Sequence, residues 1–146
     1  MSFTIITIGK IRNKNLVDEI SDLQKRITRF NIITLKEVKE KNIDVLRRKE
    51  FDLIKPYLKP NVKKVLLWEF GREFNTNDFY EFCNKQEQDI LFIITGAFGP
   101  CDELKKEVDF TLSLSKMTFT HEQALYMLVE QLYRVDCFEK NIPYTK

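Results

Sequence analysis

Apolar residues along the chain follow two alternating patterns, continuous short runs and helical spacings. The continuous runs, rich in β-branched and large apolar residues, predict strands over 3–9, 31–38, 62–70, 90–95 and 110–114. Between them, apolar residues recur three or four positions apart, which predicts amphipathic helices over 15–29, 43–58, 76–84, 101–107 and 120–138. The chain is therefore expected to alternate strands with helices from end to end.

This alternation predicts an α/β fold with a mostly parallel sheet and helices on both of its faces. The runs at 65–68 and 91–94 are apolar throughout, which is typical of strands buried on both sides. Ligands bind beyond the carboxyl ends of the strands in open α/β sheets. A site is accordingly expected where 68–71, 95–99 and 114–119 meet.

Size and composition narrow the class of protein. A chain of 146 residues fits one domain, residues 1–146. No apolar run approaches the ~20 residues that span a bilayer, and no basic segment followed by an apolar stretch opens the chain, so a cytoplasmic protein without membrane contact is expected. Cys83, Cys101 and Cys137 lack metal-ligand spacing, which predicts reduced thiols and no metal site.

Charge is unevenly distributed along the chain. Residues 1–64 hold 16 Lys and Arg against 8 Asp and Glu, a net charge of +8, whereas residues 65–146 have a net charge of −6. A basic half can attract phosphates, which hints at a nucleic acid. Charge alone, however, favours a simpler explanation, namely that these basic residues lie on a helix face exposed to water.

Two loops could hold a ligand. The turn from Gly96 to Gly99 follows a buried strand, and glycine lets a ligand approach the backbone, although an ordinary strand-to-helix turn fits equally. The segment 112–119 begins as strand and becomes loop. Met117 and Phe119 in it could form the walls of a site for a flat heterocycle, or could pack into the core.

The start of the last helix combines a cap with the only histidine. Thr120 and Gln123 fit a capping box. His121 between them could shuttle a proton, since its unperturbed pKa is ~6.5, or could be structural in the first turn.

The last helix has two apolar seams, Leu125–Leu128–Leu132–Val135 and Tyr126–Val129–Tyr133–Cys137. A helix that is apolar on two sides is buried on two sides. The two seams predict a homodimer, in which a second copy of the chain covers the second seam. The alternative is a central helix that is covered by loops of the same chain.

Several of these residues together resemble a known family. The segments 112–119, 130–134 and 143–144, with His121 and with 9–11 and 71–72, are similar in order and spacing to ribosomal RNA large subunit methyltransferase H, a small SPOUT-class enzyme. The resemblance covers the whole chain. It implies a SPOUT fold with a C-terminal trefoil knot, a homodimer, and S-adenosylmethionine as methyl donor. It also implies methylation at N3 of a pseudouridine in helix 69 of 23S rRNA, on the assembled 70S ribosome.

The resemblance carries over site residues position by position. The positions implied to bind the cofactor are Trp68, Thr95, Gly96, Gly99, Leu114, Ser115, Lys116, Met117, Thr118 and Phe119. The catalytic candidates are His121, Arg134, Tyr144 and Lys146.

Five positions depart from the usual family pattern. Trp68 stands where the family usually has Leu, Thr95 where it has Gly, Thr120 where it has Pro, Leu125 where it has Arg, and Thr145 where it has His. The missing Arg and His are candidates for RNA binding and for removal of the N3 proton, which a base or electrostatic helper must assist. Alongside the active enzyme, an alternative therefore stays open: a dimer that binds cofactor or ribosome without methylating.

Overall fold

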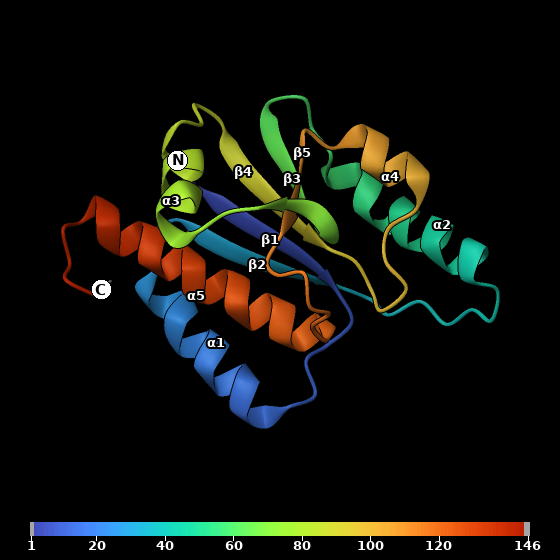
Figure 1. Ribbon diagram of the computed structural model, residues 1–146. Helices are drawn as coiled ribbons and strands as arrows, with labels where there is room; N and C mark the ends of the chain where they lie inside the picture. The colour runs from blue at the N-terminus through green and yellow to red at the C-terminus, as the bar shows by residue number, and fades with distance from the viewer. Residues whose placement is uncertain (1, 145–146) are drawn as a thin grey trace.

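A sheet of five strands forms the centre of the computed structural model, which describes residues 2–144 (Figure 1). The strands are β1 (Phe3–Ile8), β2 (Phe30–Leu35), β3 (Val62–Glu73), β4 (Asp89–Ile94) and β5 (Phe110–Ser113). Their order in the sheet is β2-β1-β4-β3-β5, and every neighbouring pair is parallel. The predicted parallel sheet is confirmed.

Helices cover both faces of this sheet, as predicted (Figure 1). The helices on one face are α1 (Lys14–Arg26), α3 (Thr76–Asn84) and α5 (His121–Glu139). Those on the other are α2 (Ile43–Ile54), its extension η1 (Lys55–Tyr57) and α4 (Asp102–Glu107). In β4, Ile90, Phe92 and Ile94 belong to the first core while Leu91 and Ile93 belong to the second. Apolar layers on both sides explain why this strand has no polar alternation.

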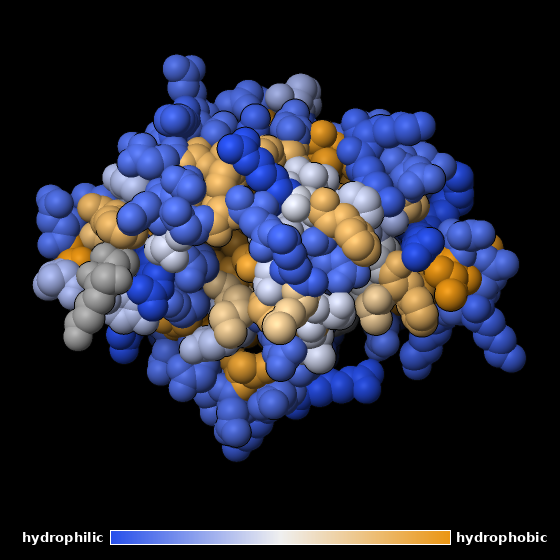
Figure 2. Space-filling view, viewed as in Figure 1, coloured by the Kyte–Doolittle hydropathy of each residue, from blue (hydrophilic) through white to orange (hydrophobic). Residues whose placement is uncertain are grey.

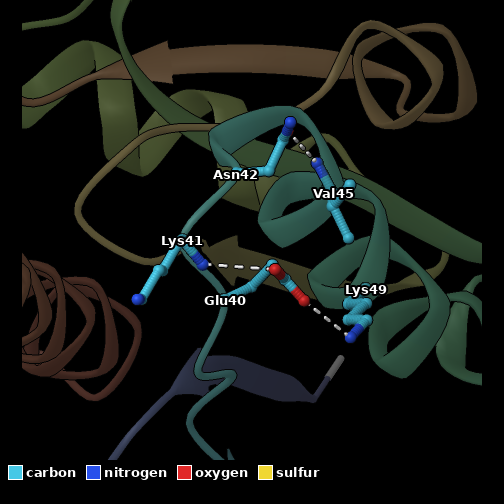
Figure 3. Close-up of polar contacts among 5 residues, drawn as sticks. All are labelled: Glu40, Lys41, Asn42, Val45 and Lys49. Carbon is cyan, nitrogen blue, oxygen red and sulfur yellow. Dashed lines mark hydrogen bonds and ion pairs between the residues drawn. The ribbon is translucent and has the colours of Figure 1, made fainter.

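The start of α2 is fixed by local polar contacts (Figure 3). The Asn42 side chain accepts a hydrogen bond from the Val45 N–H at 3.1 Å, as an N-cap does. Lys49 Nζ lies 2.9 Å from Glu40 Oε2, and this hydrogen bond and charge hold the pKa of Glu40 below its ordinary value. The helix that starts at the carboxyl edge of the sheet therefore begins at a defined residue.

The predicted helix over 15–29 is too long at its C-terminus. Here α1 ends at Arg26, since Ile27 already has extended backbone and Arg29 adopts a left-handed φ of 55°. The Thr28 N–H instead donates to the buried Asp136 carboxylate on α5 at 3.4 Å. A tertiary contact thus replaces the last helical turn, and no local signal reveals it.

The helix α5 is largely covered within one chain. Val129 and Cys137 of its second apolar seam are buried together with the whole first seam, while Tyr126 and Tyr133 stay partly exposed. The cover comes from α1 and α3, which pack on either side of α5. Figure 2 shows the face that carries α1 and α5 as mostly hydrophilic, with hydrophobic residues in separate patches. A single chain therefore satisfies most of the pattern on which the homodimer was predicted, and the homodimer stays a prediction.

The strand β3 contains an excursion of four residues, 68–71. Leu67 and Arg72 both pair with Leu112 of β5, so the residues between them leave the ladder. Gly71 ends the excursion against β5, where an added Cβ would lie 2.7 Å from the Thr111 carbonyl carbon and 2.9 Å from the Leu112 nitrogen. Only glycine allows the two backbones to approach this closely.

No helix within residues 2–144 has the length and hydropathy to cross a membrane.

Candidate functional site

A pocket of about 630 Å³ opens at the carboxyl ends of β3, β4 and β5. The three segments predicted to meet there, 68–71, 95–99 and 114–119, each supply lining residues. The N-terminal turn of α5 and the first turns of α2 and α4 complete the wall. The volume lies in the ~300–1,000 Å³ range of small-molecule sites.

Most of the predicted cofactor positions share this pocket. Its walls include Trp68, Thr95, Gly96, Gly99, Leu114, Ser115, Met117, Thr118 and Phe119. Lys116 is the exception, because its exposed side chain lies outside the lining and its ammonium is 3.9 Å from the Glu73 carboxylate.

The turn after β4 is held from two sides. Gly99 adopts a φ of +77° and its N–H donates to the Gly96 carbonyl at 3.1 Å. From α2, the Nε–H of Arg47 donates to the Phe98 carbonyl at 2.9 Å. Thr95 is buried in the pocket wall and is not among the residues with positive φ in the described chain. A β-branched residue is therefore accommodated there without backbone strain.

Glu50 on α2 supports the same turn from below. Its side chain is buried, and its Oε1 accepts a hydrogen bond from the Gly96 N–H at 3.3 Å. Burial raises the pKa of the Glu50 carboxyl, while the Gly96 N–H and the Arg47 charge pull the pKa in the opposite direction. No sequence pattern indicated a role for Glu50, since a glutamate in an amphipathic helix normally faces water.

Hydrogen bonds hold the loop after β5 to β5 itself and to β3. Ser113 Oγ donates to the Ser115 carbonyl at 2.8 Å, and the Met117 N–H donates to Ser115 Oγ at 3.0 Å. Thr118 Oγ1 donates to Glu69 Oε2 of the β3 excursion at 2.8 Å. Met117 points outward and is 76% exposed, so the core-packing alternative is wrong for this residue.

Phe119 is partly buried and, like Leu112 and Leu114, lines both the main pocket and a neighbouring cavity of about 360 Å³. The smaller cavity lies between β5, α3 and α5.

The helix α5 brings His121 to the edge of the main pocket. The predicted capping box is present, with Thr120 and Gln123 each bonding the backbone of the other. The Nε2 of His121 lies 2.6 Å from the buried Thr7 hydroxyl at the end of β1. Burial is the main reason why the pKa of His121 lies below its ordinary value, although Glu122 and Glu37 oppose the shift. The imidazole is consequently neutral at pH 7 and can accept a proton.

The remaining catalytic candidates lie elsewhere. Arg134 is thirteen residues beyond His121 on α5, roughly 20 Å along the helix axis. Its guanidinium pairs with Glu130 and lies 5.0 Å from the centre of the Tyr144 ring. Lys146 lies outside the described residues, as does the departure at Thr145. Within one chain, His121 is therefore separated from Arg134 and Tyr144.

Leu125, where the family resemblance expects Arg, is 1% exposed and belongs to the core beneath α5. This chain therefore has no cation at that position to face the pocket.

Several lining residues were not predicted individually from the sequence. Arg47 and Arg48 of α2 belong to the basic half of the chain, so the charge asymmetry was a usable signal for them. Phe70 lies within the segment 68–71 that was expected at the site, whereas Lys105 carried no signal, because its position depends on the packing of α4. In the described part of the chain, no three His, Cys, Asp or Glu side chains gather as metal ligands would.

Comparison with known proteins agrees with this geometry. The sequence pattern of a family described as "Predicted SPOUT methyltransferase" matches residues 1–145. A protein of Fusobacterium nucleatum named ribosomal RNA large subunit methyltransferase H is 37% identical, with 100% of each chain covered.

Solved structures share the fold at low sequence identity. A putative RNA methyltransferase from Bacillus anthracis superposes with a TM-score of 0.58 and 14% identity, covering 99% of this chain and 98% of that one. The SpoU methyltransferase AviRb from Streptomyces viridochromogenes, in complex with the cofactor AdoMet, superposes with a TM-score of 0.50 and 11% identity. That match covers 91% of this chain and 57% of AviRb.

Proposed function

The chain belongs to the SPOUT methyltransferase family, and on that premise we propose that it transfers a methyl group from S-adenosylmethionine to 23S rRNA. The target we propose is N3 of a pseudouridine in helix 69 of the assembled ribosome. The observation that carries the proposal is the convergence of three strand-end loops and His121 on one pocket of about 630 Å³.

The chemistry of the pocket suits the methyl donor. Trp68, Leu114 and Phe119 supply apolar walls for a flat purine ring, and the irregular backbone of the two loops supplies polar groups for its edge. The open side of Gly99, where an added Cβ would meet nothing within 4 Å, leaves room for a ligand against the turn. When bound there, S-adenosylmethionine would supply an electrophilic methyl on its sulfonium.

His121 is the residue of the pocket best suited to take up the N3 proton of the target base. It is neutral at pH 7, and Thr7 fixes its orientation through Nε2. A positioned general base typically contributes ~10²–10⁴-fold to a rate. The remaining acceleration would come from holding the base and the donor in line inside the pocket.

The separation of Arg134 and Tyr144 from His121 supports a homodimer. A second copy could place its own Arg134 and Tyr144 beside the pocket of the first, whereas one chain holds them roughly 20 Å away along α5. The trefoil knot implied by the resemblance and a cytoplasmic location stay predictions.

The decisive experiment measures methyl transfer. Purified protein with labelled S-adenosylmethionine should methylate 70S ribosomes, and mass spectrometry should place the label at N3 of a helix 69 pseudouridine. Label in another nucleotide would reject the helix 69 assignment, and no label in any RNA would reject the methyltransferase proposal.

A mixing experiment tests the shared site. His121→Ala and Arg134→Ala should each be inactive alone, and a mixture of the two should recover about a quarter of the wild-type rate, because half of the dimers then hold one intact site. No recovery, or a single species of about 17.5 kDa in sedimentation, would contradict the dimer.

The core position of Leu125 favours one alternative function. Without the cation that the family places there, the protein could bind cofactor and ribosome without transferring a methyl group. Calorimetry separates the two, since binding of S-adenosylmethionine without turnover on ribosomes would support the non-enzymatic dimer.

A further inference from the structure

The three most exposed large apolar side chains of the described chain surround the same pocket. They are Met117 at 76% exposure, Phe70 at 73% and Phe98 at 52%. Exposed apolar residues scattered singly are ordinary, but three gathered at one opening are not.

The two phenylalanines are held in these positions by backbone features rather than by loose loops. Phe70 stands on the β3 excursion, which Gly71 closes against β5. Its ring lies 5.2 Å from Trp68, edge to face, and Trp68 in turn lies beneath the Lys105 ammonium at 4.2 Å. Phe98 also lines the pocket, on the turn after β4, and its backbone is held by the hydrogen bond from Arg47 to its carbonyl.

Charged side chains line the same opening. Lys105 lies over the Trp68 ring, and Arg47 bonds the Phe98 carbonyl, while Arg48 pairs with Glu103 at 2.9 Å. A continuous apolar patch would indicate a protein partner, whereas flat rings interleaved with cations match a nucleobase and its phosphates.

We propose that Phe70 and Phe98 form an aromatic clamp that stacks on an unstacked nucleobase of single-stranded RNA at the mouth of the pocket. The inference rests on the proposed function in one respect, namely that an enzyme acting on a base takes that base out of the helical stack. It adds the residues that receive the unstacked base. Arg47, beside Phe98, then lies where an adjoining phosphate would pass.

Fluorescence anisotropy tests the clamp without turnover. The probes are a labelled RNA hairpin with an unpaired loop and a fully paired duplex of the same length, each with S-adenosylhomocysteine present. Phe70→Leu and Phe98→Leu keep an apolar side chain but remove the ring. Each should weaken hairpin binding by about 5- to 100-fold and leave duplex binding unchanged, as loss of base–aromatic stacking predicts. Val17→Ala, an exposed apolar residue on α1, should change neither.

The outcomes separate the clamp from the proposed function. If wild-type protein methylates ribosomes and both leucine variants bind the hairpin normally, the clamp is wrong and the function stands. If wild-type protein does not methylate but binds the hairpin through the two rings, the clamp stands and the function is wrong. Unchanged hairpin affinity with weaker self-association in sedimentation would assign the rings to an interface between copies and overturn the clamp.

Discussion

The buried carboxylate of Glu50 accepts a hydrogen bond from the Gly96 N–H at 3.3 Å and fills the space that a side chain at position 96 would need. The helix α2 and the turn after β4, 46 residues apart in the chain, therefore define each other's position. Because that turn lines the pocket, the contact couples the stability of the fold to the shape of the site.

Gly96→Ala should destabilise the protein by about 1–3 kcal/mol, because its methyl group would displace the carboxyl of a buried glutamate. Urea unfolding measures the loss, and binding of S-adenosylmethionine should weaken in parallel. Glu50→Ala opens the same space, so the double variant should lose less stability than the two single losses added together. Strict additivity would show that the two residues are not coupled.

Glu50 should also make stability depend on pH. Burial raises its pKa in the folded protein above the ordinary value of 4.5, so the folded state binds more protons than the unfolded state in that range. Stability should therefore fall as pH rises from 4.5 through the raised pKa. Gln at position 50 keeps an acceptor for Gly96 and cannot ionise, so unfolding of Glu50→Gln followed from pH 4 to 8 should lack this decline. Parallel curves for the two proteins would contradict the assignment.

His121 should show the opposite dependence. Its pKa is lowered by burial below 6.5, so the unfolded state binds the proton more tightly. Wild-type protein should lose stability relative to His121→Gln as pH falls below 6.5. If His121 is the base, the variant should also lose ~10²–10⁴-fold in kcat/KM together with the acidic limb of the pH–rate profile. A variant that retains that limb would exclude His121 as the base.

Leu125→Arg, which restores the residue expected from the family, should not restore function in this chain. Position 125 is 1% exposed in the core, and an unpaired buried charge costs about 3–5 kcal/mol. Thermal unfolding should show a large drop in Tm. Met127→Arg, at a position of the same helix that is 44% exposed, is the matched control and should change Tm little. A stable and more active Leu125→Arg would show that the helix can turn this side chain to the pocket.

Gly71→Ala should disrupt the β3 excursion. A Cβ there meets the Thr111 carbonyl oxygen at 2.8 Å, and neither backbone can move without breaking the pairing of β3 with β5. A loss of about 1–3 kcal/mol is expected in urea unfolding. Phe70→Ala, one residue away and exposed, should cost almost nothing in stability. Equal stability of Gly71→Ala and wild type would mean that the excursion is not closed by this contact.

The local pattern of apolar and polar residues was enough to predict the helices, the strands and the layers that they form. The apolar run of β4 reflects burial on both faces of that strand. The spacing of Leu16, Ile20 and Leu23 reflects burial of one face of α1. The three strand ends were also predictable, because parallel strands bring their carboxyl ends to one edge.

Contacts between distant segments were not predictable in this way. Glu50 looks solvated in its helix, yet it lies beneath Gly96. The excursion at 68–71 looks like the end of a strand, yet the pairing resumes at Arg72. The second seam of α5 suggested a partner chain, yet Val129 and Cys137 are buried within one chain, in which α1 and α3 pack against α5. In each case the deciding partner lies too far along the sequence for periodicity to reveal.

The strand β3 resumes its pairing with β5 at Arg72, and this limits where the sequence of the protein can vary. Both flanks of the segment 68–71 stay anchored to Leu112, so residues 68–70 can be exchanged without shifting the register of the sheet, provided that Gly71 stays glycine. Sequence variation in this short segment would alter what the mouth of the pocket accepts while the scaffold beneath it stays the same. The segment is therefore the natural place to graft a different recognition element onto this fold.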